Sequence, residues 1–307
     1  MAGGVPVVTS PIDCTLVVVA YHRPASLRRL LDGVYASGEI APRLVIVNVE
    51  GDTEVATIAR DFGATAVTVP NRGYAAAVNR GSSEVHDAVT VFCGDDLEIG
   101  PASLRRLVAT VASGAADVAA PRIVDAGGHD EGSVRALPTP GRLLVEWAVT
   151  PDRPHAARHR VEKWRRPTRT ESVEAFDAAL VAVRTSVLRT TPLPEDYFLY
   201  WEELDWCWQL RAAGLRSVVV PDAVVRHDGG RDDVRADKQR LLARNAVRCV
   251  YRTQGRSAAA RAWPVVVLWQ LRLLVVDAFR SLGGRGNRAG ARLAGLGAAL
   301  GAWREFA

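Results

Sequence analysis

The sequence predicts an α/β protein in which a mostly parallel sheet is flanked by helices and followed by a C-terminal helical appendage. Short, uninterrupted apolar runs recur through the first 230 residues, as expected for strands buried on both faces of a parallel sheet. Segments with helical spacing of apolar residues alternate with these runs. Beyond that point the pattern is helical only. We therefore divide the chain into a domain over residues 1–230 and a helical region over 231–307.

The first half of the chain alternates strand and helix signals. Proline or threonine opens the helical segments, and glycine or a polar turn closes most of them. Apolar runs predict strands at 15–20, 44–47, 66–69, 88–93 and 117–120. Helices are expected from Pro24 to Gly38, from Thr53 to Phe62, after Tyr74 to Gly81, and from Pro101 to Val111.

The second half is less regular. Residues 125–170 are rich in Arg, His, Pro and Gly and predict a long loop, which inside a domain is usually functional or mobile. Strand-like patterning returns at 175–183 and again at 217–220. A further strand is expected to end at His227. A lone histidine of this kind is more often structural than a ligand, so its role depends on what faces it.

Composition limits the classes of function. The chain has 307 residues, of which 48% are hydrophobic, and a net charge of +5, which suits anionic ligands such as nucleoside diphosphates or an acidic membrane surface. No nucleic-acid recognition motif is present, so we expect no nucleic-acid partner. Four scattered cysteines match neither a zinc site nor a disulfide framework, and the N-terminus lacks a signal-peptide pattern. These features predict a cytoplasmic protein.

The C-terminal region contains an apolar run over residues 264–276, which Gln270 and Arg272 interrupt. The run is shorter than the roughly 20 apolar residues that span a bilayer. Arginines and tryptophans flank it, as in helices that lie in a membrane interface. A helical hairpin that packs on the domain or across a homodimer explains the pattern equally well, and both interpretations stay open.

An acidic cluster opens the helix expected from about Glu202 to Ala213. Counting three, four and seven residues onward from Glu203 reaches Trp206, Cys207 and Leu210, whereas the same count from Glu202 reaches mostly polar side chains. A carboxylate on the apolar side loses solvent, so its pKa rises and it becomes able to hold an abstracted proton. Glu203 is therefore the candidate general base. The alternative is a pair of solvated acids that stabilise the helix start.

Polar loops follow three of the predicted strands, at residues 48–52, 71–79 and 95–96. In a parallel α/β sheet, ligands bind in the crevice outside the carboxyl ends of the strands. Each loop alone is explained by ordinary turn chemistry, because Asn, Asp and Gly are common turn residues. Their coincidence predicts one shared crevice.

Four ordered motifs resemble the inverting family 2 glycosyltransferases of GT-A fold, and in particular the rhamnosyltransferase-like and galactofuranosyltransferase-like branch. The likeness covers about residues 15–230. The motifs are Tyr21-His22-Arg23-Pro24 after the first strand, Asn71-Arg72-Gly73-Tyr74-Ala75-Ala76-Ala77-Val78-Asn79-Arg80-Gly81, Cys93-Gly94-Asp95-Asp96-Leu97, and Phe198 to Gly214 with His227 after it.

The resemblance implies a role for each matched residue. Glu203 takes the position of the general base. Asp96, assisted by Asp95, and His227 would hold a divalent ion, Mn²⁺ or Mg²⁺, with the imidazole mildly favouring Mn²⁺. The acceptor side is expected to include Trp201, Glu202 and Asp205. The donor side is expected to include Tyr21, Arg23, Asn48, Glu50, Asn71, Gly73, Asn79 and Asp95.

The implied reaction transfers a sugar, such as rhamnose or galactofuranose, from a dTDP or UDP donor to a glycan or lipid-linked acceptor of the cell envelope. The protein would work in the cytoplasm, at the inner face of the plasma membrane. Four positions depart from the family pattern: Asn48 to Gly51 replace Asp-Asn-x-Ser, Gly94 replaces an aspartate, Glu203 replaces an aspartate, and Gln209 replaces an arginine.

Two other classes compete with this interpretation. The departures from the pattern favour a non-catalytic nucleotide-sugar-binding or scaffold protein as the main alternative. A sugar nucleotidyltransferase ranks last, because the residues after the first strand, Ala20 to Pro24, contain no glycine-rich phosphate loop.

Overall fold

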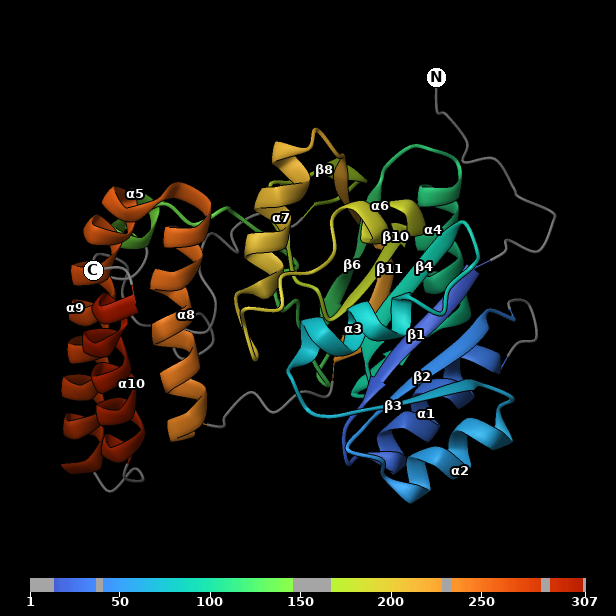
Figure 1. The fold of residues 1–307 in the computed structure, drawn as a ribbon, viewed down its shortest axis with the longest axis horizontal. Coiled ribbons are helices and arrows are strands. Elements are labelled where there is room, and N and C mark those ends of the chain that lie inside the picture. Colours follow the sequence, from blue (N-terminus) through green and yellow to red (C-terminus); the bar gives the residue numbers. More distant parts are fainter. Residues whose placement is uncertain (1–13, 37–40, 146–166, 228–233, 283–287, 306–307) are drawn as a thin grey trace.

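The computed structural model describes residues 14–36, 41–145, 167–227, 234–282 and 288–305 (Figure 1). The strands are β1 (Cys14–Ala20), β2 (Arg43–Val49), β3 (Thr65–Val69), β4 (Val89–Gly94), β5 (Leu97–Ile99), β6 (Val118–Val124), β7 (Val134–Arg135), β8 (Glu171–Ser172), β9 (Ala175–Phe176), β10 (Leu180–Arg184) and β11 (Ser217–His227). The helices of the sheet region are α1 (Pro24–Tyr35), α2 (Thr53–Asp61), α3 (Tyr74–Ser82), α4 (Pro101–Ala112), α5 (Pro140–Leu143), α6 (Thr185–Thr190) and α7 (Glu202–Ala212).

The main sheet has the strand order β3-β2-β1-β4-β10-β6-β11-β5, and β8 pairs with β11. β3, β2, β1 and β4 are mutually parallel, as the continuous apolar runs predicted. β10 lies antiparallel between β4 and β6, so the sheet is mixed beyond its parallel half. The predicted α/β class, with helices on both faces of the sheet, is confirmed.

Two observed strands differ from the predicted ones. The segment expected as one strand at 175–183 is split into β9 and β10, because Asp177 to Ala179 turn between two sheets. The segments around Pro221 form the single long strand β11, whose register to β6 shifts between Val220 and Val224. Part of the predicted loop at 125–170 forms β7 and α5, and residues 146–166 lie outside the described part of the chain.

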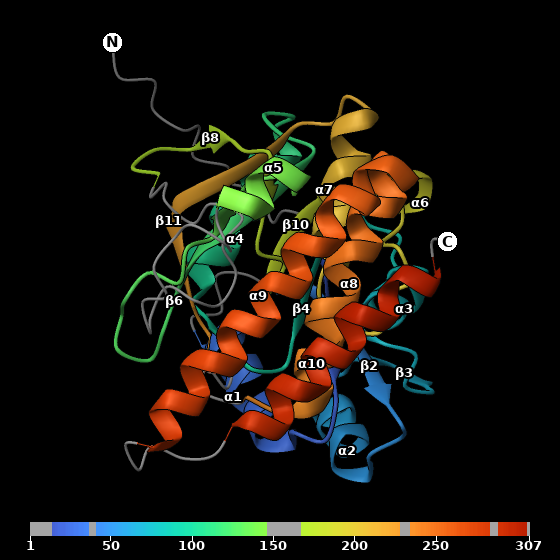
Figure 2. The same ribbon diagram turned by 90° about the vertical axis from the view of Figure 1, so that its left-hand side faces the viewer.

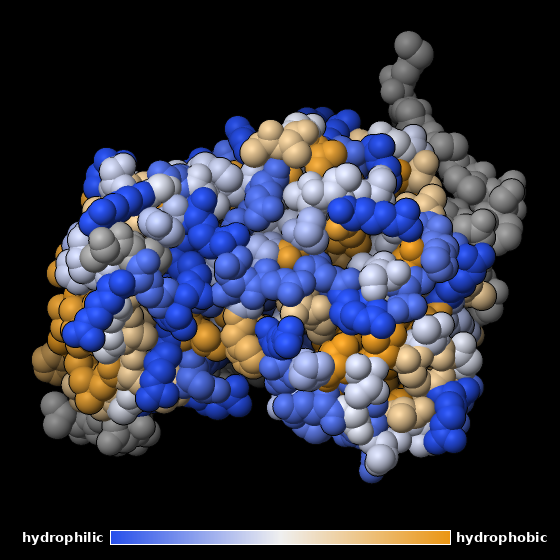
Figure 3. All heavy atoms as spheres, in the orientation of Figure 1, coloured by the Kyte–Doolittle hydropathy of each residue, from blue (hydrophilic) through white to orange (hydrophobic). Residues whose placement is uncertain are grey.

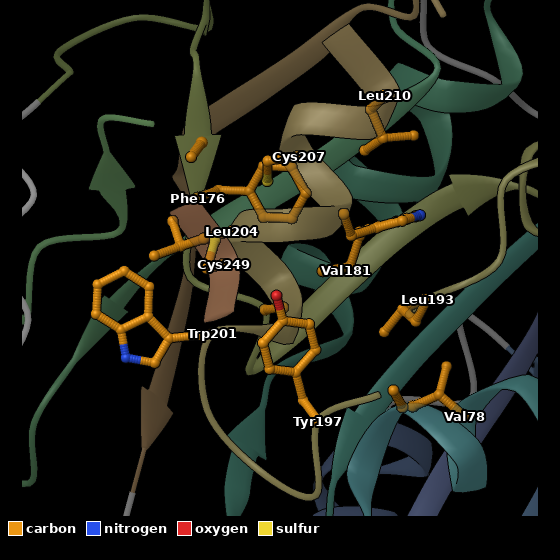
Figure 4. Packing of buried hydrophobic residues seen from close by; sticks show 14 of the residues in the cluster. Val78, Phe176, Val181, Leu193, Tyr197, Trp201, Leu204, Cys207, Leu210 and Cys249 are labelled. Carbon is orange, nitrogen blue, oxygen red and sulfur yellow. The ribbon is translucent and has the colours of Figure 1, made fainter. Parts of the chain in front are cut away.

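Hydrophobic side chains fill both faces of the sheet. One cluster joins the sheet to α1, α2 and α4. The other joins it to α3, α7 and the C-terminal helices, and includes Phe176, Tyr197, Trp201 and Leu204 (Figure 4). The ring of Trp206 packs edge-on against Phe92 and Phe176, at centroid distances of 5.9 and 6.0 Å. α7 is therefore anchored deeply while its first turn points toward the strand ends.

The C-terminal region consists of α8 (Ala236–Gln254), α9 (Arg256–Leu282) and α10 (Ala289–Ala302), followed by a 3₁₀ turn at Trp303–Glu305. The three helices lie side by side, and α8 is the one that packs on α7 (Figures 1 and 2). Buried residues of α8 and α9, such as Val247 and Ala259, belong to the same cluster as those of α7. The division at residue 230 stays a prediction about chain organisation, but the two parts share one core.

The length of α9 corrects one expectation. The apolar run at 264–276 was predicted to be too short for a bilayer, but the helix continues well beyond it in both directions. By length and composition alone, Arg256–Phe279 qualifies as a membrane span among the described residues, with a mean hydropathy of 1.5. Within the 18-residue stretch of this segment that meets the hydropathy criterion, 33% is buried inside the protein.

Candidate active site

The loops after β1, β2 and β4 converge near the start of α7. Within the described chain, non-glycine residues with left-handed backbone conformations are found in the loops after β1 and β2 and in the segment before α7: His22, Glu50, Tyr200 and Trp201, with φ between 52° and 78°. Such conformations cost on the order of 1–3 kcal/mol each and cluster at functional sites. The strand ends at which the crevice was predicted therefore coincide with the strained part of the backbone.

Asp95 and Asp96 follow β4 directly. One carboxylate oxygen of Asp95 accepts the backbone N–H of Tyr21 at 3.0 Å, and burial raises the pKa of Asp95 to about 6. Asp96 Oδ2 lies 3.1 Å from Arg23 Nη1 and 3.6 Å from His227 Nε2. Burial favours the neutral form of Asp96, but His227 and Arg23 outweigh it and hold the pKa of Asp96 below its ordinary value.

His227, at the end of β11, also approaches a carboxylate that sequence reasoning missed. Its Nδ1 lies 3.5 Å from Glu131 Oε2, in the loop after β6. A metal-binding histidine usually directs its second ring nitrogen to a carboxylate, which fixes the orientation of the ring. In the sequence, Glu131 was distinguished only by its place in the long stretch at 125–170 that was predicted to be functional or mobile.

The predicted ligands of the divalent ion are Asp96, assisted by Asp95, and His227. Within the described residues, no group of three or more His, Cys, Asp and Glu side chains is placed to hold an ion. Asp96 and His227 nevertheless supply one carboxylate and one imidazole at a single point. Divalent ions at nucleotide sites take few protein ligands and complete their shell with phosphate oxygens and water. The residues therefore fit an ion that arrives with a diphosphate, and do not form an all-protein cage.

The acidic pair at the start of α7 differs from the helical-wheel expectation. Glu202, predicted to face polar surroundings, is 6% exposed, and its Oε2 is buried without a hydrogen-bond partner among the described residues. Burial, and then the charge of Glu203, raises the pKa of Glu202 to about 8. Glu203 keeps 15% of its side chain exposed and pairs with Arg135 of β7. Burial in this first turn is set by neighbouring elements rather than by the periodicity of α7.

Tyr74, in the first turn of α3, carries a buried hydroxyl group that is affected by both Asp96 and Glu202. Its hydroxyl is buried and has no hydrogen-bond partner within the described chain. Burial raises the pKa of Tyr74 well above its ordinary value, and the charges of Cys93, Asp96 and Glu202 raise it further. The Tyr74 hydroxyl therefore lies in the electric field of both the Asp96 group and the Glu202 carboxyl, and stays a donor at neutral pH.

Gly73 brings the start of α3 against the loop that precedes α7. Its φ is 101°, and a Cβ atom there would lie 2.1 Å from the carbonyl oxygen of Phe198. The neighbouring Tyr74 N–H donates to that same oxygen at 3.1 Å. Only glycine permits this approach, so Gly73 is explained by backbone packing. Asn71 supports the turn by accepting the Gly73 N–H at 3.3 Å.

Some predicted donor-side residues are used by the fold itself. Asn48 is buried, and its side chain closes the loop after β2 through bonds to the Asp52 backbone at 2.8 and 2.9 Å. The Asn79 amide binds the backbone of Leu193 and the carboxylate of Glu195. Direct contact of these two residues with the donor stays a prediction, but their side chains already have partners within the fold. Tyr21, Arg23 and Glu50 keep exposed side chains in the loops after β1 and β2.

On the acceptor side, Trp201 and Asp205 are buried. Trp201 belongs to the core cluster (Figure 4), so stacking on a sugar is not supported. Asp205 accepts hydrogen bonds from Tyr197 Oη at 2.9 Å, Gln209 Nε2 at 2.9 Å and Arg252 Nε at 2.7 Å. Its predicted role in orienting the helix fits these contacts, whereas acceptor binding does not.

α8 fixes the loop before the acidic pair. The amide of Asn245 is buried and donates to the carbonyl oxygens of Leu199 at 2.9 Å and Tyr200 at 3.0 Å. These bonds hold the strained conformations of Tyr200 and Trp201, from which α7 begins. The C-terminal helices are thus part of the scaffold that aims the first turn of α7.

Replacing Asp205 by asparagine is expected to destabilise the fold by about 2–3 kcal/mol, because a neutral amide cannot satisfy all three donors. The loss is no larger because 33% of the Arg252 side chain stays in solvent, which screens its attraction to Asp205. Urea unfolding measures the change. The matched control is Asp196→Asn, which removes the exposed partner of the same arginine and should cost less than about 1 kcal/mol. Equal losses in both variants would contradict this account of Asp205.

Glu202 is expected to make stability depend on pH. The folded protein holds the Glu202 proton up to about pH 8, whereas an ordinary glutamate loses it near 4.5. The native state therefore binds more protons between these values, and stability falls as the pH rises through this window. Glu202→Gln should flatten that decline in urea unfolding measured across the window. A decline as steep as in the wild type would show that Glu202 does not cause it.

The mixed sheet flanked by helices, with carboxylates after its strands, agrees with the GT-A fold expected from the sequence. Residues 11–251 match the family model described as "Glycosyltransferase like family 2". This match covers most of the chain, so the protein belongs to glycosyltransferase family 2. It reaches into α8, which agrees with the part that α8 plays in holding the site. No curated protein matches the chain.

Solved structures share the fold at low sequence identity. GalNAc-T7, solved with UDP, GalNAc and Mn²⁺, aligns with a TM-score of 0.55 and 15% identity over 78% of this chain and 48% of its own. TarS of S. aureus aligns with a TM-score of 0.49 and 12% identity over 84% of this chain and 43% of its own. The chain therefore spans about half the length of these proteins or less, and the likeness concerns the fold.

Proposed function

We propose that this protein is an inverting, metal-dependent glycosyltransferase that moves a sugar from a nucleoside diphosphate to an acceptor hydroxyl. The observation that carries the proposal is the meeting of Asp96, Arg23 and His227 at the strand ends, while the bond from the Tyr74 N–H to the Phe198 carbonyl ties the start of α3 to the loop before α7. The first group suits the diphosphate and its cation, and the acidic pair at the start of α7 suits the acceptor proton. Direct attack by the acceptor on the sugar, in one displacement, inverts the anomeric centre.

Asp96 and His227 would hold the divalent ion, with Glu131 orienting the imidazole. When bound, the ion acts as a Lewis acid that neutralises the departing diphosphate. Arg23 lies at the same point and is suited to phosphate oxygens, because a guanidinium offers several N–H donors in a fixed plane. Asp95 fixes the loop after β1 through the Tyr21 N–H, and so positions Arg23.

Glu203 is proposed as the general base, but the reason is no longer the desolvation of its carboxylate that the sequence predicted. Glu202 is the desolvated member of the pair and holds a proton at neutral pH, since its pKa is raised to about 8. Glu203 is the less buried carboxylate and is oriented by Arg135. A base must reach the acceptor hydroxyl before its pKa matters. Glu202 then contributes by reducing the negative charge beside Glu203.

The donor and acceptor are proposed from the resemblance in sequence. A UDP or dTDP sugar, with rhamnose or galactofuranose transferred, suits the likeness of the motifs, and GalNAc-T7 binds UDP with Mn²⁺. The acceptor is proposed to be a cell-envelope glycan or a lipid-linked sugar, met in the cytoplasm at the inner face of the plasma membrane. The apolar, arginine-flanked C-terminal helices motivate this location.

A donor screen tests the proposed function. Purified protein with Mn²⁺ is incubated with a panel of UDP and dTDP sugars, and release of nucleoside diphosphate is measured with and without added glycan acceptors. We expect one donor to be turned over above the background without enzyme, and EDTA to abolish that turnover. Release from no donor under any of these conditions would contradict the proposal.

A non-catalytic nucleotide-sugar-binding protein is the second candidate. Gly94 stands where the family has a metal-binding aspartate, and Arg23 already neutralises Asp96 without a metal. Calorimetry with UDP and dTDP distinguishes the two. Tight binding that is indifferent to Mn²⁺, with no turnover in the donor screen, would favour this second function.

A further inference from the structure

α9 is apolar on both of its sides. On one side Ala259, Ala262 and Val266 are fully buried, and the helix packs on α5, α8 and α10. On the other side Leu268, Leu271, Val275 and Phe279 are exposed at helical spacing. A helix of a water-soluble surface normally carries polar side chains there. The exposed side of α9 is therefore an unexplained apolar surface.

α10 extends this surface. It runs beside α9 on the outer edge of the molecule (Figure 2) and exposes two further leucines. Apolar residues gather at this edge, at the left of Figure 3. We call this set the α9–α10 apolar face; it comprises Leu268, Leu271, Val275, Phe279, Leu293 and Leu300, and Phe279 is the most exposed at 70%.

The charges of these helices are almost entirely positive. In the described parts of α9, α10 and the final turn, the acidic residues are Asp277 and Glu305. Asp277 is buried and pairs with Arg292 at 2.7 Å, and Glu305 pairs with Arg244 and Arg248 of α8. Both acids are thus neutralised within the chain. The guanidinium of Arg272 lies over the Trp269 ring at 5.6 Å, an amphipathic pair suited to an interface.

We propose that the α9–α10 apolar face docks onto an anionic lipid surface, with its helices lying in the plane of the interface. Leucine, valine and phenylalanine side chains enter the acyl boundary, and the surrounding arginines meet lipid phosphates. This inference deepens the membrane location given in the proposed function and in that respect rests on it, but binding to vesicles is measured without any sugar transfer. It supplies a physical reason for a lipid-linked acceptor, because the membrane brings such an acceptor to the protein.

A helix lying in the interface fits the contacts of α9 better than a helix crossing the bilayer. Crossing would require α9 to leave α10, which would break the buried Asp277–Arg292 pair. It would also break the hydrogen bond from Trp263 Nε1 to the Ala299 carbonyl at 2.8 Å. Breaking a buried ion pair leaves charges without partners and is strongly destabilising.

A second copy of the chain fits the face less well than lipid does. Two such faces brought together by a two-fold axis would oppose arginines with arginines, because the acids of these helices are already paired. An anionic membrane supplies the missing negative charge. Charge complementarity therefore selects lipid as the occupant.

Vesicle flotation tests the proposal with the full-length protein. The vesicles contain either phosphatidylcholine alone or equal parts of phosphatidylcholine and phosphatidylglycerol. We expect flotation with the anionic vesicles at low salt, and weakening as salt is added. The double variant Leu268→Ser/Phe279→Ser should partition at least about tenfold less. Both side chains are exposed, so the thermal midpoint should stay unchanged. Val224→Ser, an exposed apolar residue on β11, is the matched control and should float like the wild type.

Several outcomes would overturn the proposal. One is that the wild-type protein does not float with the anionic vesicles. Another is equal flotation of the double variant and the wild type. Protein that resists extraction by alkaline carbonate would indicate a spanning helix instead. Light scattering that shows a dimer, dissociated by the double variant, would assign the face to a second copy.

Discussion

Glu203→Gln is expected to lower kcat by about 10²–10⁴-fold, the usual contribution of a general base. The amide keeps the shape of the side chain but cannot take the acceptor proton. Arg135, which pairs with Glu203, would lose this negatively charged partner but keep its position in β7. Binding of the donor should change little, because the diphosphate side is built by Asp96, His227 and Arg23. The measurement is nucleoside diphosphate release at saturating donor, with the donor Kd from calorimetry.

The matched control is Glu84→Gln, which removes another glutamate that pairs with an arginine, on the surface at the end of α3. It should leave kcat unchanged. A Glu203→Gln protein that keeps wild-type kcat would remove Glu203 from the mechanism. If Glu202→Gln then lost activity instead, the base would be the buried member of the pair.

Asp96→Asn is expected to lower kcat/KM by at least about 100-fold, because Lewis-acid stabilisation of a leaving group contributes several kcal/mol. In contrast to Glu203→Gln, this variant should also weaken binding of the nucleoside diphosphate in Mn²⁺. Arg23 and His227 would both lose the carboxylate that they approach. Calorimetry with UDP and dTDP, with and without Mn²⁺, measures the effect.

Asp61→Asn is the control for Asp96→Asn, since Asp61 also pairs with an arginine but lies on the surface of α2. It should bind the donor like the wild type. If Asp96→Asn retained metal-dependent binding of wild-type strength, the ion would have other ligands and the site would be wrongly placed.

The fold was predictable because local and global signals agree. The continuous apolar runs of β1, β2 and β4 required burial on both faces, and the structure provides it. The reversal of β10 was not predictable, because an antiparallel strand that is covered on both faces has the same apolar pattern as a parallel one. The length of α9 was missed because only the apolar run from Pro264 onward was counted, whereas Pro264 lies inside a longer helix.

The site was predictable only in part. Asp96 and His227 are brought together by β4 and β11, as the ordered motifs implied. The burial of the acidic pair was predicted the wrong way round, since elements distant in the chain pack around α7, among them α8 and β9, and the sequence of α7 holds no information about them. Asn48 and Asn79 illustrate a general ambiguity: an amide at a strand end suits a ligand and a turn equally well, and only contacts separate the two.

Arg135, Glu131 and Asn245 had no sequence signal of their own. Each acts through a partner distant in the chain, Glu203, His227 and the Leu199–Tyr200 carbonyls respectively. Only the three-dimensional arrangement pairs them. The contribution of α8 was missed for the same reason, because the likeness in motifs ends before that helix begins.

The most direct test of the shared crevice is a crystal of the protein soaked with UDP and Mn²⁺, with the ion located by its anomalous scattering. The account predicts a single strong peak in contact with the Asp96 carboxylate and the His227 imidazole, and UDP phosphates beside it. Manganese bound elsewhere, or UDP bound away from the start of α7, would contradict the account.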